Sequence, residues 1–228
     1  MKITWLGQAG LLFETPECTV MVDPYLSDSL GAIKPKLRRR VPVDERFFEV
    51  KPDILLFTHD HMDHYDPETA ARFITAETDI TVLAPASVWG KVREIGGDNN
   101  YVSFNRRTQW TQSGLRFTAV KAEHSDPFAI GVVIEDLSDG KNYYITGDTL
   151  YNTDVFADLP EDIYAVFLPV NGVGNNMNMT DAARFADRIH ARYTVPLHVG
   201  LFDSLSAEDF PKENKIIPSF YKEIHIGE

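Results

Sequence analysis

Residues 54–64 of the chain read ILLFTHDHMDH, an apolar run followed at once by three histidines and two aspartates. The apolar part fits a strand that is buried on both faces, as in a parallel sheet covered by helices. Polar side chains that follow such a strand stand on a rigid support at the edge of a sheet. The stretch therefore predicts an α/β protein with a functional site where this strand ends.

The three histidines have a spacing that suits metal binding. His59 and His61 lie two residues apart, so in extended backbone both imidazoles point to one side and can meet one metal ion. Asp63 and His64 enter the following turn and can present a carboxylate and an imidazole to a second ion. Two ions about 3.5 to 4 Å apart can polarise a substrate oxygen and hold a hydroxide at neutral pH, which is the chemistry of metal-dependent hydrolysis.

Three further candidate ligands stand where later strands are expected to give way to loops: His124, Asp148 and His198. Asp148 follows Gly147 and is well suited to bridge two ions with one carboxylate. The complete set contains five of the seven histidines in the chain. That concentration favours metal binding over an incidental pair of histidines.

Hydrophobic periodicity and turn residues predict the remaining elements. Helices are expected at residues 66–76, 86–95 and 181–191, the first with Asp66 as N-cap and the last capped by Thr180 or Asp181. Strands are expected at residues 2–6, 11–15, 19–22, 54–57, 80–83, 115–120, 129–135, 143–146, 165–168 and 194–197. This order predicts two packed sheets with helices outside, in one domain over residues 1–228.

Composition excludes several classes of partner and site. A net charge of −12 argues against a nucleic-acid partner, because such proteins neutralise many phosphates. The single cysteine, Cys18, excludes an internal disulfide and a cysteine-based zinc site. The sequence contains neither the apolar region of a signal peptide nor the roughly 20 apolar residues of a membrane span. We therefore expect no membrane association and, for a bacterial or archaeal source, a cytoplasmic protein; a homo-oligomer remains open.

Positive charge is concentrated in residues 34–40, which read KPKLRRR, within a region at 24–46 that lacks periodicity. This region is expected to form an exposed loop or a short helix. The basic segment is either a solvated charged loop or a surface that receives an anionic substrate near the site.

The order of the candidate ligands resembles that of the metallo-β-lactamase superfamily. The resemblance consists of His-x-His-x-Asp-His after an apolar strand, followed by single His, Asp and His residues, and it spans residues 59–198. Within the superfamily, the Thr-His-Asp-His-x-Asp-His form of the first motif resembles the ascorbate-6-phosphate lactonase-like branch. So do three further stretches: VDPY at 22–25, PVNG at 169–172 and NMT at 178–180.

This resemblance implies a four-layer αββα sandwich with the metal ions in a groove at one edge. It assigns the ligands to two ions: His59, His61 and His124 to the first; Asp63, His64 and His198 to the second; and Asp148 to both. It also implies a catalytic role for Asp63, which would orient the attacking water or hydroxide and relay its proton to the leaving group.

Other side chains are candidates for contact with the substrate. Tyr65 either stabilises a developing oxyanion or caps the helix that follows it. Asn171 and Asn178 belong to a loop rich in uncharged donors, which suits a sugar or a polar ring but is also ordinary loop composition.

A second set of residues can support the site. Asp23 can hydrogen-bond a ligand histidine or serve only as a turn residue before proline. Trp5 and Gln8 can lie near the groove, although core packing and turn hydrogen bonding are equally open. His190 and His225 are expected to be surface or packing residues.

The sequence thus predicts an enzyme, a metal-dependent hydrolase that uses a metal-bound hydroxide on a small lactone or ester, with or without a phosphate group. The alternatives are a phosphodiesterase of the same fold and, from a different class, a di-iron redox protein. Zinc is the first choice of metal, with manganese and iron as alternatives, and one ion or two can be held.

Overall fold

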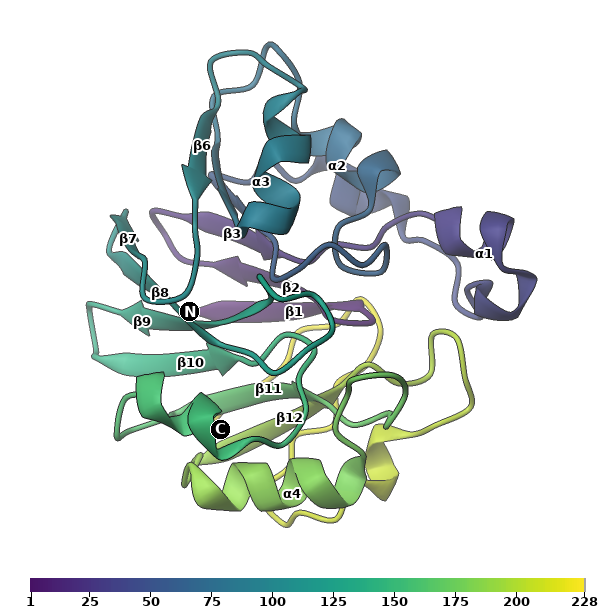
Figure 1. Ribbon diagram of the computed structural model, residues 1–228, viewed down its shortest axis with the longest axis vertical. Coiled ribbons are helices and arrows are strands. Elements are labelled where there is room, and N and C mark those ends of the chain that lie inside the picture. Colours follow the sequence, from purple (N-terminus) through teal and green to yellow (C-terminus); the bar gives the residue numbers. More distant parts are fainter. Residues whose placement is uncertain (228) are drawn as a thin grey trace.

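The structure is a computed structural model, and it describes residues 1–227. Two six-stranded sheets pack face to face (Figure 1). The first sheet contains, in spatial order, β1 (Lys2–Gly7), β2 (Gly10–Glu14), β3 (Thr19–Val22), β4 (Ile54–Leu56), β5 (Thr81–Ala84) and β6 (Asn100–Ser103). The second contains β12 (Tyr193–Leu197), β11 (Ala165–Pro169), β10 (Lys141–Ile145), β9 (Ile130–Asp136), β8 (Leu115–Lys121) and β7 (Gln109–Gln112).

The interior between the sheets is apolar because alternate residues of the strands point into it. Phe13, Phe117 and Phe167 meet there, each at most 1% exposed, and Phe13 packs edge-on against Phe167 with 5.9 Å between ring centroids. Large aromatic rings at this interface contribute much of the buried apolar area that stabilises the sandwich.

Helices cover the outer face of each sheet. Apolar side chains of α2 (Pro67–Phe73) and α3 (Ala86–Arg93) pack with those of the first sheet, and α4 (Met179–Arg188) covers the second. Figure 1 shows these helices at opposite ends of the stack, with α1 (Ser29–Ile33) standing to one side. The arrangement confirms the expected four-layer αββα sandwich. None of the helices in residues 1–227 is long and apolar enough to cross a membrane.

Short 3₁₀ segments complete the described elements: η1 (Pro35–Leu37), η2 (Glu45–Glu49), η3 (Thr153–Asp158) and η4 (Ala207–Asp209). The expected helix ends need correction. The first two helices stop at Phe73 and Arg93, and the last begins earlier than expected because Asn178, rather than Thr180 or Asp181, is its N-cap. Strands β6 and β7 were not predicted.

Strand direction brings the candidate ligands to one edge. Strand β8 is antiparallel to β9 and β9 to β10, while β10, β11 and β12 are parallel, so β8, β10 and β12 run the same way. Their carboxyl ends therefore lie at the same edge of the second sheet, where His124, Asp148 and His198 follow them.

A segment near the C-terminus joins the two sheets along their β1 and β12 edges. The N–H groups of Tyr221 and Ile224 donate to the carbonyls of Trp5 and Ile3 on β1, and the N–H of Ile216 donates to Thr194 on β12. The Trp5 ring also stacks on Phe220 at 4.3 Å, so Trp5 belongs to the core.

Candidate metal centre

The predicted ligands lie together in two groups. The first group comprises His59, His61, His124 and Asp148; the second comprises Asp63, His64 and His198. Within each group one nitrogen or oxygen of every side chain lies within 4.8 Å of one from every other, which is the spacing that allows a shared ion. The structure thus brings together all seven side chains.

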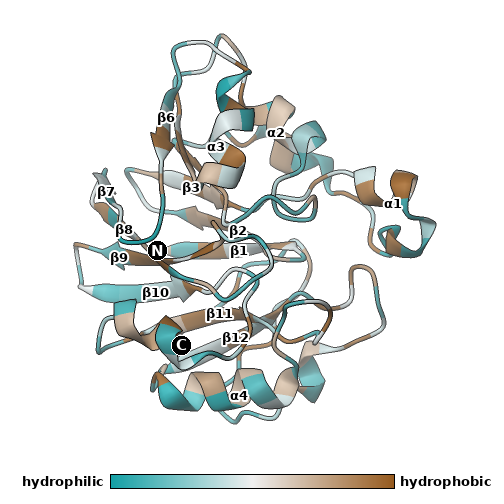
Figure 2. Ribbon diagram, viewed as in Figure 1, coloured by the Kyte–Doolittle hydropathy of each residue, from teal (hydrophilic) through white to brown (hydrophobic). Residues whose placement is uncertain are grey.

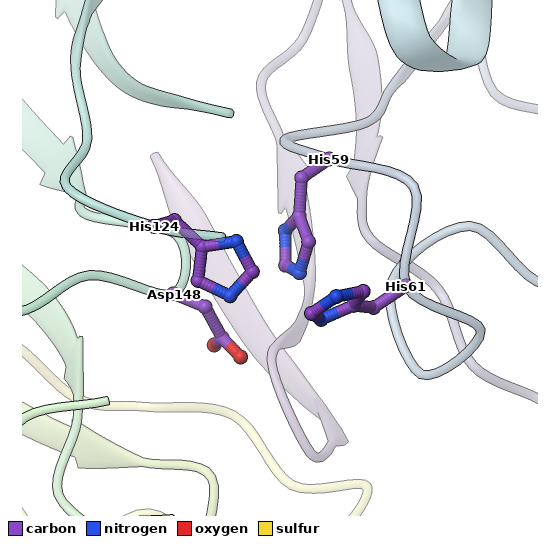
Figure 3. A group of neighbouring side chains, drawn as sticks. All are labelled: His59, His61, His124 and Asp148. Carbon is purple, nitrogen blue, oxygen red and sulfur yellow. The ribbon is translucent and has the colours of Figure 1, made fainter. Parts of the chain in front are cut away.

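In the first group the rings of three histidines converge with the Asp148 carboxylate (Figure 3). The ring centroid of His59 lies 4.7 Å from that of His61 and 4.4 Å from that of His124. His59 is fully buried, whereas His61 is exposed and marks the solvent side of the group.

Asp148 also contacts the second group. Its Oδ1 atom lies 3.2 Å from Nε2 of His64 and 3.3 Å from Nε2 of His198. The carboxylate thus stands between the two groups, as bridging of two ions requires. Asp63 reaches His198 from the other side, with 3.3 Å between Oδ2 and Nε2.

Buried hydrogen bonds fix the His64 ring. Nδ1 of His64 lies 2.7 Å from Oδ2 of Asp23, and Oδ1 of Asp23 accepts the backbone N–H of Thr58 at 2.8 Å. A carboxylate that accepts the Nδ1–H leaves Nε2 as the free ligand atom. This geometry favours the supporting role of Asp23 over that of a simple turn residue.

Gly147 allows the Asp148 loop to approach the His59 strand closely. Its φ is +59°, and a Cβ at this position would lie 2.8 Å from the carbonyl oxygen of Ile130 and 3.1 Å from Cβ of Thr58. Only glycine accommodates both the left-handed backbone and the close approach. The loop end of β10 is therefore held against the loop end of β4.

Gln8 connects the turn after β1 to the second group. Its Nε2 donates to Oδ2 of Asp63 at 2.9 Å and lies 2.9 Å from Nδ1 of His198. The backbone carbonyl of Gln8 accepts the backbone N–H of His198. The amide nitrogen of Asn171 also lies 2.9 Å from Nδ1 of His198. The sequence left two interpretations of Gln8 open, a place near the groove and a hydrogen bond within the turn. A glutamine in a glycine-flanked turn gives no signal of a metal site by itself.

The charge balance depends on mutual pairing of acids and imidazoles. Burial alone would lower the pKa of His64, but facing carboxylates outweigh it and raise this pKa well above the usual value. The same balance raises the pKa of His198 to about 9 and lowers the pKa values of Asp63 and Asp148 despite their burial. The pKa of His59 is lowered, first by burial and then by the neighbouring His64. A divalent cation bound by these side chains would replace the imidazole protons as the positive charge beside the two carboxylates.

One unpartnered atom indicates that the donor set fits a metal ion. Nε2 of His59 is buried and has no hydrogen-bond partner among the described residues. Burying such an atom without a partner costs free energy, and it belongs to the converging group. Nitrogen and carboxylate ligands suit zinc, manganese or iron.

A cavity of about 610 Å³ opens beside the second group. Its metal-facing wall contains Gln8, His61, Asp63, Asn171 and His198. The volume is that of a site for a small organic molecule. Asp63, the predicted catalytic residue, faces the cavity. Its side chain is 18% exposed, so a ligand in the cavity can reach it.

Two of the three predicted substrate contacts, Tyr65 and Asn178, lie outside the wall of this cavity. Tyr65 is not part of the wall of this cavity; it is 6% exposed and packs edge-on against Phe57 at 5.2 Å in the apolar cluster of the first sheet. Asn178 caps α4 by accepting the N–H of Asp181 at 2.9 Å and lines a neighbouring cavity of about 430 Å³. Only Asn171 lines both cavities.

Comparison with known proteins agrees with this geometry. Residues 19–199 match the family model described as the beta-lactamase superfamily domain. A UPF0173 metal-dependent hydrolase of Ruegeria is 29% identical over 251 residues, which cover 99% of this chain and 100% of the relative. A UPF0173 protein of Pyrococcus furiosus is also 29% identical, over 93% of this chain and 90% of the relative.

Solved structures share the fold at lower identity. Igni18, a metallo hydrolase from Ignicoccus hospitalis, superposes with a TM-score of 0.76 at 18% identity, covering 97% of this chain and 96% of its own. An isothiocyanate hydrolase from Delia radicum gut bacteria superposes with a TM-score of 0.74 at 19% identity, covering 99% of both chains. The chain therefore belongs to the beta-lactamase superfamily and is a metal-dependent hydrolase of the metallo-β-lactamase fold.

Proposed function

We propose that the protein hydrolyses a small carboxylic ester or lactone at a centre that binds two divalent ions, with zinc as the first choice of metal. The observation that carries this proposal is the position of Asp63. Its carboxylate belongs to the second ligand group and also faces a cavity large enough for a small organic substrate.

The metals, when bound, would polarise the substrate carbonyl and increase the acidity of water. His59, His61 and His124 would hold one ion and Asp63, His64 and His198 the other, with Asp148 between them. The cavity lined by His61 and Asp63 would hold the substrate beside these ligands.

Asp63 acts in this proposal as the proton carrier. Its Oδ2 accepts the Gln8 amide N–H at 2.9 Å, which fixes the orientation of the carboxylate. The carboxylate accepts the proton of the attacking water and returns it to the alkoxide oxygen that leaves when the ester or lactone bond breaks. The proton taken from the water thus neutralises the leaving alkoxide, and no other acid is needed.

The basic segment gives no support for a phosphate group on the substrate. Arg39 donates to the carbonyls of Tyr25 and Val41, and Arg40 donates to that of Asp203, so both guanidinium groups hold loops together. Arg38 lies 3.4 Å from Asp28. We therefore propose an ester or lactone without a required phosphate, and phosphodiesters serve as the alternative substrate in the test.

The test compares wild type with Asp63→Asn on p-nitrophenyl acetate, a γ-lactone and bis-p-nitrophenyl phosphate, before and after chelation. Wild type should hydrolyse the ester and lactone in a chelator-sensitive manner. Asp63→Asn should lower kcat by about 10²- to 10⁴-fold. His190→Asn, which removes an exposed histidine outside the centre, is the matched control.

Elemental analysis of both variants distinguishes loss of the proton carrier from loss of metal. Chelator-sensitive hydrolysis of the phosphodiester alone would refute the ester assignment. Full activity of Asp63→Asn on the ester would refute the role of Asp63.

A further inference from the structure

The cavity beside the centre has a second, apolar wall. It is formed by α1, the adjoining η1 and loops after β4, β11 and β12, and its apolar side chains are Leu30, Ile33, Leu37, Met62, Val173 and Phe202. Figure 2 shows hydrophobic residues in α1, which stands to the side of the sandwich. This wall is built from segments far apart in the sequence.

Two of these apolar side chains are largely exposed to solvent. Ile33 is 62% and Val173 is 64% exposed, although both are aliphatic. Ile33 comes from α1 and Val173 from the loop between β11 and α4, yet they line the same cavity. Converging apolar side chains left open to solvent at a cavity are typical of a ligand site.

Charge on this wall is nearly balanced and offers no cluster of cations to an anionic group. Apart from the candidate metal ligands, the charged side chains at the cavity are Lys34, Asp60 and Asp203, one ammonium against two carboxylates. Asp60 lies 3.1 Å from Lys91, whereas the salt bridges of the described residues include no carboxylate within 4.0 Å of Lys34. The cavity thus combines a polar, metal-facing wall with an apolar wall of nearly balanced charge.

We infer that the substrate carries an uncharged aliphatic or aromatic group that lies against this apolar wall while its ester bond faces Asp63. This inference rests on the proposed ester hydrolysis and adds the class of the acyl group. A medium-length acyl chain would cover Ile33 and Val173, which are otherwise left in water.

The experiment measures kcat/KM of the metal-loaded protein for p-nitrophenyl acetate, butanoate and hexanoate, and for the mono-p-nitrophenyl ester of adipate. Adipate has the length of hexanoate but ends in a carboxylate. Each added methylene should raise kcat/KM by about fourfold while it remains against the wall. The adipate ester should be at least about tenfold poorer than the hexanoate ester because its charge would be buried.

Ile33→Asp tests the wall directly. It should lower kcat/KM for hexanoate by about tenfold or more, so that the advantage over acetate disappears. Leu137→Asp is the matched control, since Leu137 is an aliphatic residue that is 41% exposed in the turn between β9 and β10, away from the cavity. The control should keep the chain-length dependence of wild type.

Failure of this inference differs from failure of the proposed function. Equal kcat/KM for acetate and hexanoate, or a preference for adipate, would overturn the inference while ester hydrolysis stands. Absence of chelator-sensitive turnover of every ester would instead overturn the proposed function.

In that second case, calorimetric titration with hexanamide and acetamide tests the wall without catalysis. Tighter binding of hexanamide that Ile33→Asp weakens would support the inference. Equal affinity for the two amides would overturn it.

Discussion

At the scale of single residues, the site depends on side chains held in uncommon backbone conformations. Gln8, Asp23 and His198 have φ values of +50°, +44° and +65°. Such conformations cost free energy for residues other than glycine and are concentrated at functional sites. Here each of the three contributes a hydrogen bond or a ligand atom to the metal centre.

Gly147→Ala should destabilise the protein by about 2 kcal/mol or more, because the added methyl group meets the Ile130 carbonyl in a left-handed backbone. The matched control is Gly140→Ala. Its φ is +72°, and nothing lies within 4 Å of the added Cβ, so only the backbone strain applies. Urea denaturation of both variants measures the difference. Equal losses would contradict the close approach of the Asp148 loop.

Gln8→Leu should lower kcat for ester hydrolysis by about tenfold, which corresponds to the free energy of one hydrogen bond to a charged group. The reason is that Leu keeps the size of the side chain but loses the donor to Asp63. Metal content and the melting temperature should remain near those of wild type. An unchanged kcat, measured with metal-loaded protein, would show that Gln8 does not position the carboxylate.

The ligand residues were predictable because their signal is local and dense. Three histidines within six residues at the end of a buried strand indicate metal binding by themselves, and the structure brings all seven predicted ligands together. Gln8 and the apolar wall were not predictable in this way. Their position depends on loops that meet only after the two sheets have packed.

At the scale of elements, the N-terminus of α2 is joined to α1, which forms part of the apolar wall of the cavity. Asp66 caps α2 by accepting the backbone N–H of Thr69 at 2.9 Å, as predicted, and it also accepts the Ser29 hydroxyl of α1 at 2.9 Å. One buried carboxylate therefore joins the helix after the histidine motif to the helix of the apolar wall.

Asp66→Ala should reduce the free energy of unfolding by about 1 to 2 kcal/mol, since α2 loses its N-cap. Asp66→Asn should lose much less, because asparagine caps helices nearly as well as aspartate. Guanidinium denaturation followed by circular dichroism checks both variants. A loss as large in Asp66→Asn as in Asp66→Ala would assign the effect to the charge rather than to capping.

The two unpredicted strands have a common physical reason. Strands β6 and β7 are the outermost strands of their sheets, and their sequences NYVS and QWTQ are mostly polar. An edge strand has one free side and is only partly buried, so it lacks the apolar alternation of the inner strands. The other strands were recognisable from their apolar runs, including β1 and β12, whose outer edges the C-terminal segment covers.

At the scale of the whole molecule, the metal centre joins the two sheets. The motif after β4 supplies ligands from the first sheet, and the ends of β8, β10 and β12 supply the others from the second. Metal binding therefore requires both sheets to be folded and in register, and it should stabilise the complete sandwich.

Addition of the metal at about 100 times its Kd should stabilise the folded protein by about 2.7 kcal/mol. For a chain of this size, that corresponds to a rise of about 5 to 10 °C in melting temperature. Differential scanning calorimetry of chelated and metal-loaded protein measures the shift, and His190→Asn should show the same rise. An unchanged melting temperature would mean that the ligands do not bind the ion preferentially in the folded state.

The central claim is that two groups of ligands share Asp148 and hold two divalent ions. Elemental analysis of gently purified wild type and Asp148→Ala tests it most directly. The account predicts close to two equivalents of metal in wild type and a loss from both groups in the variant, with His190→Asn unchanged. Wild-type protein with no more metal than Asp148→Ala, even after incubation with zinc, manganese or iron, would contradict it.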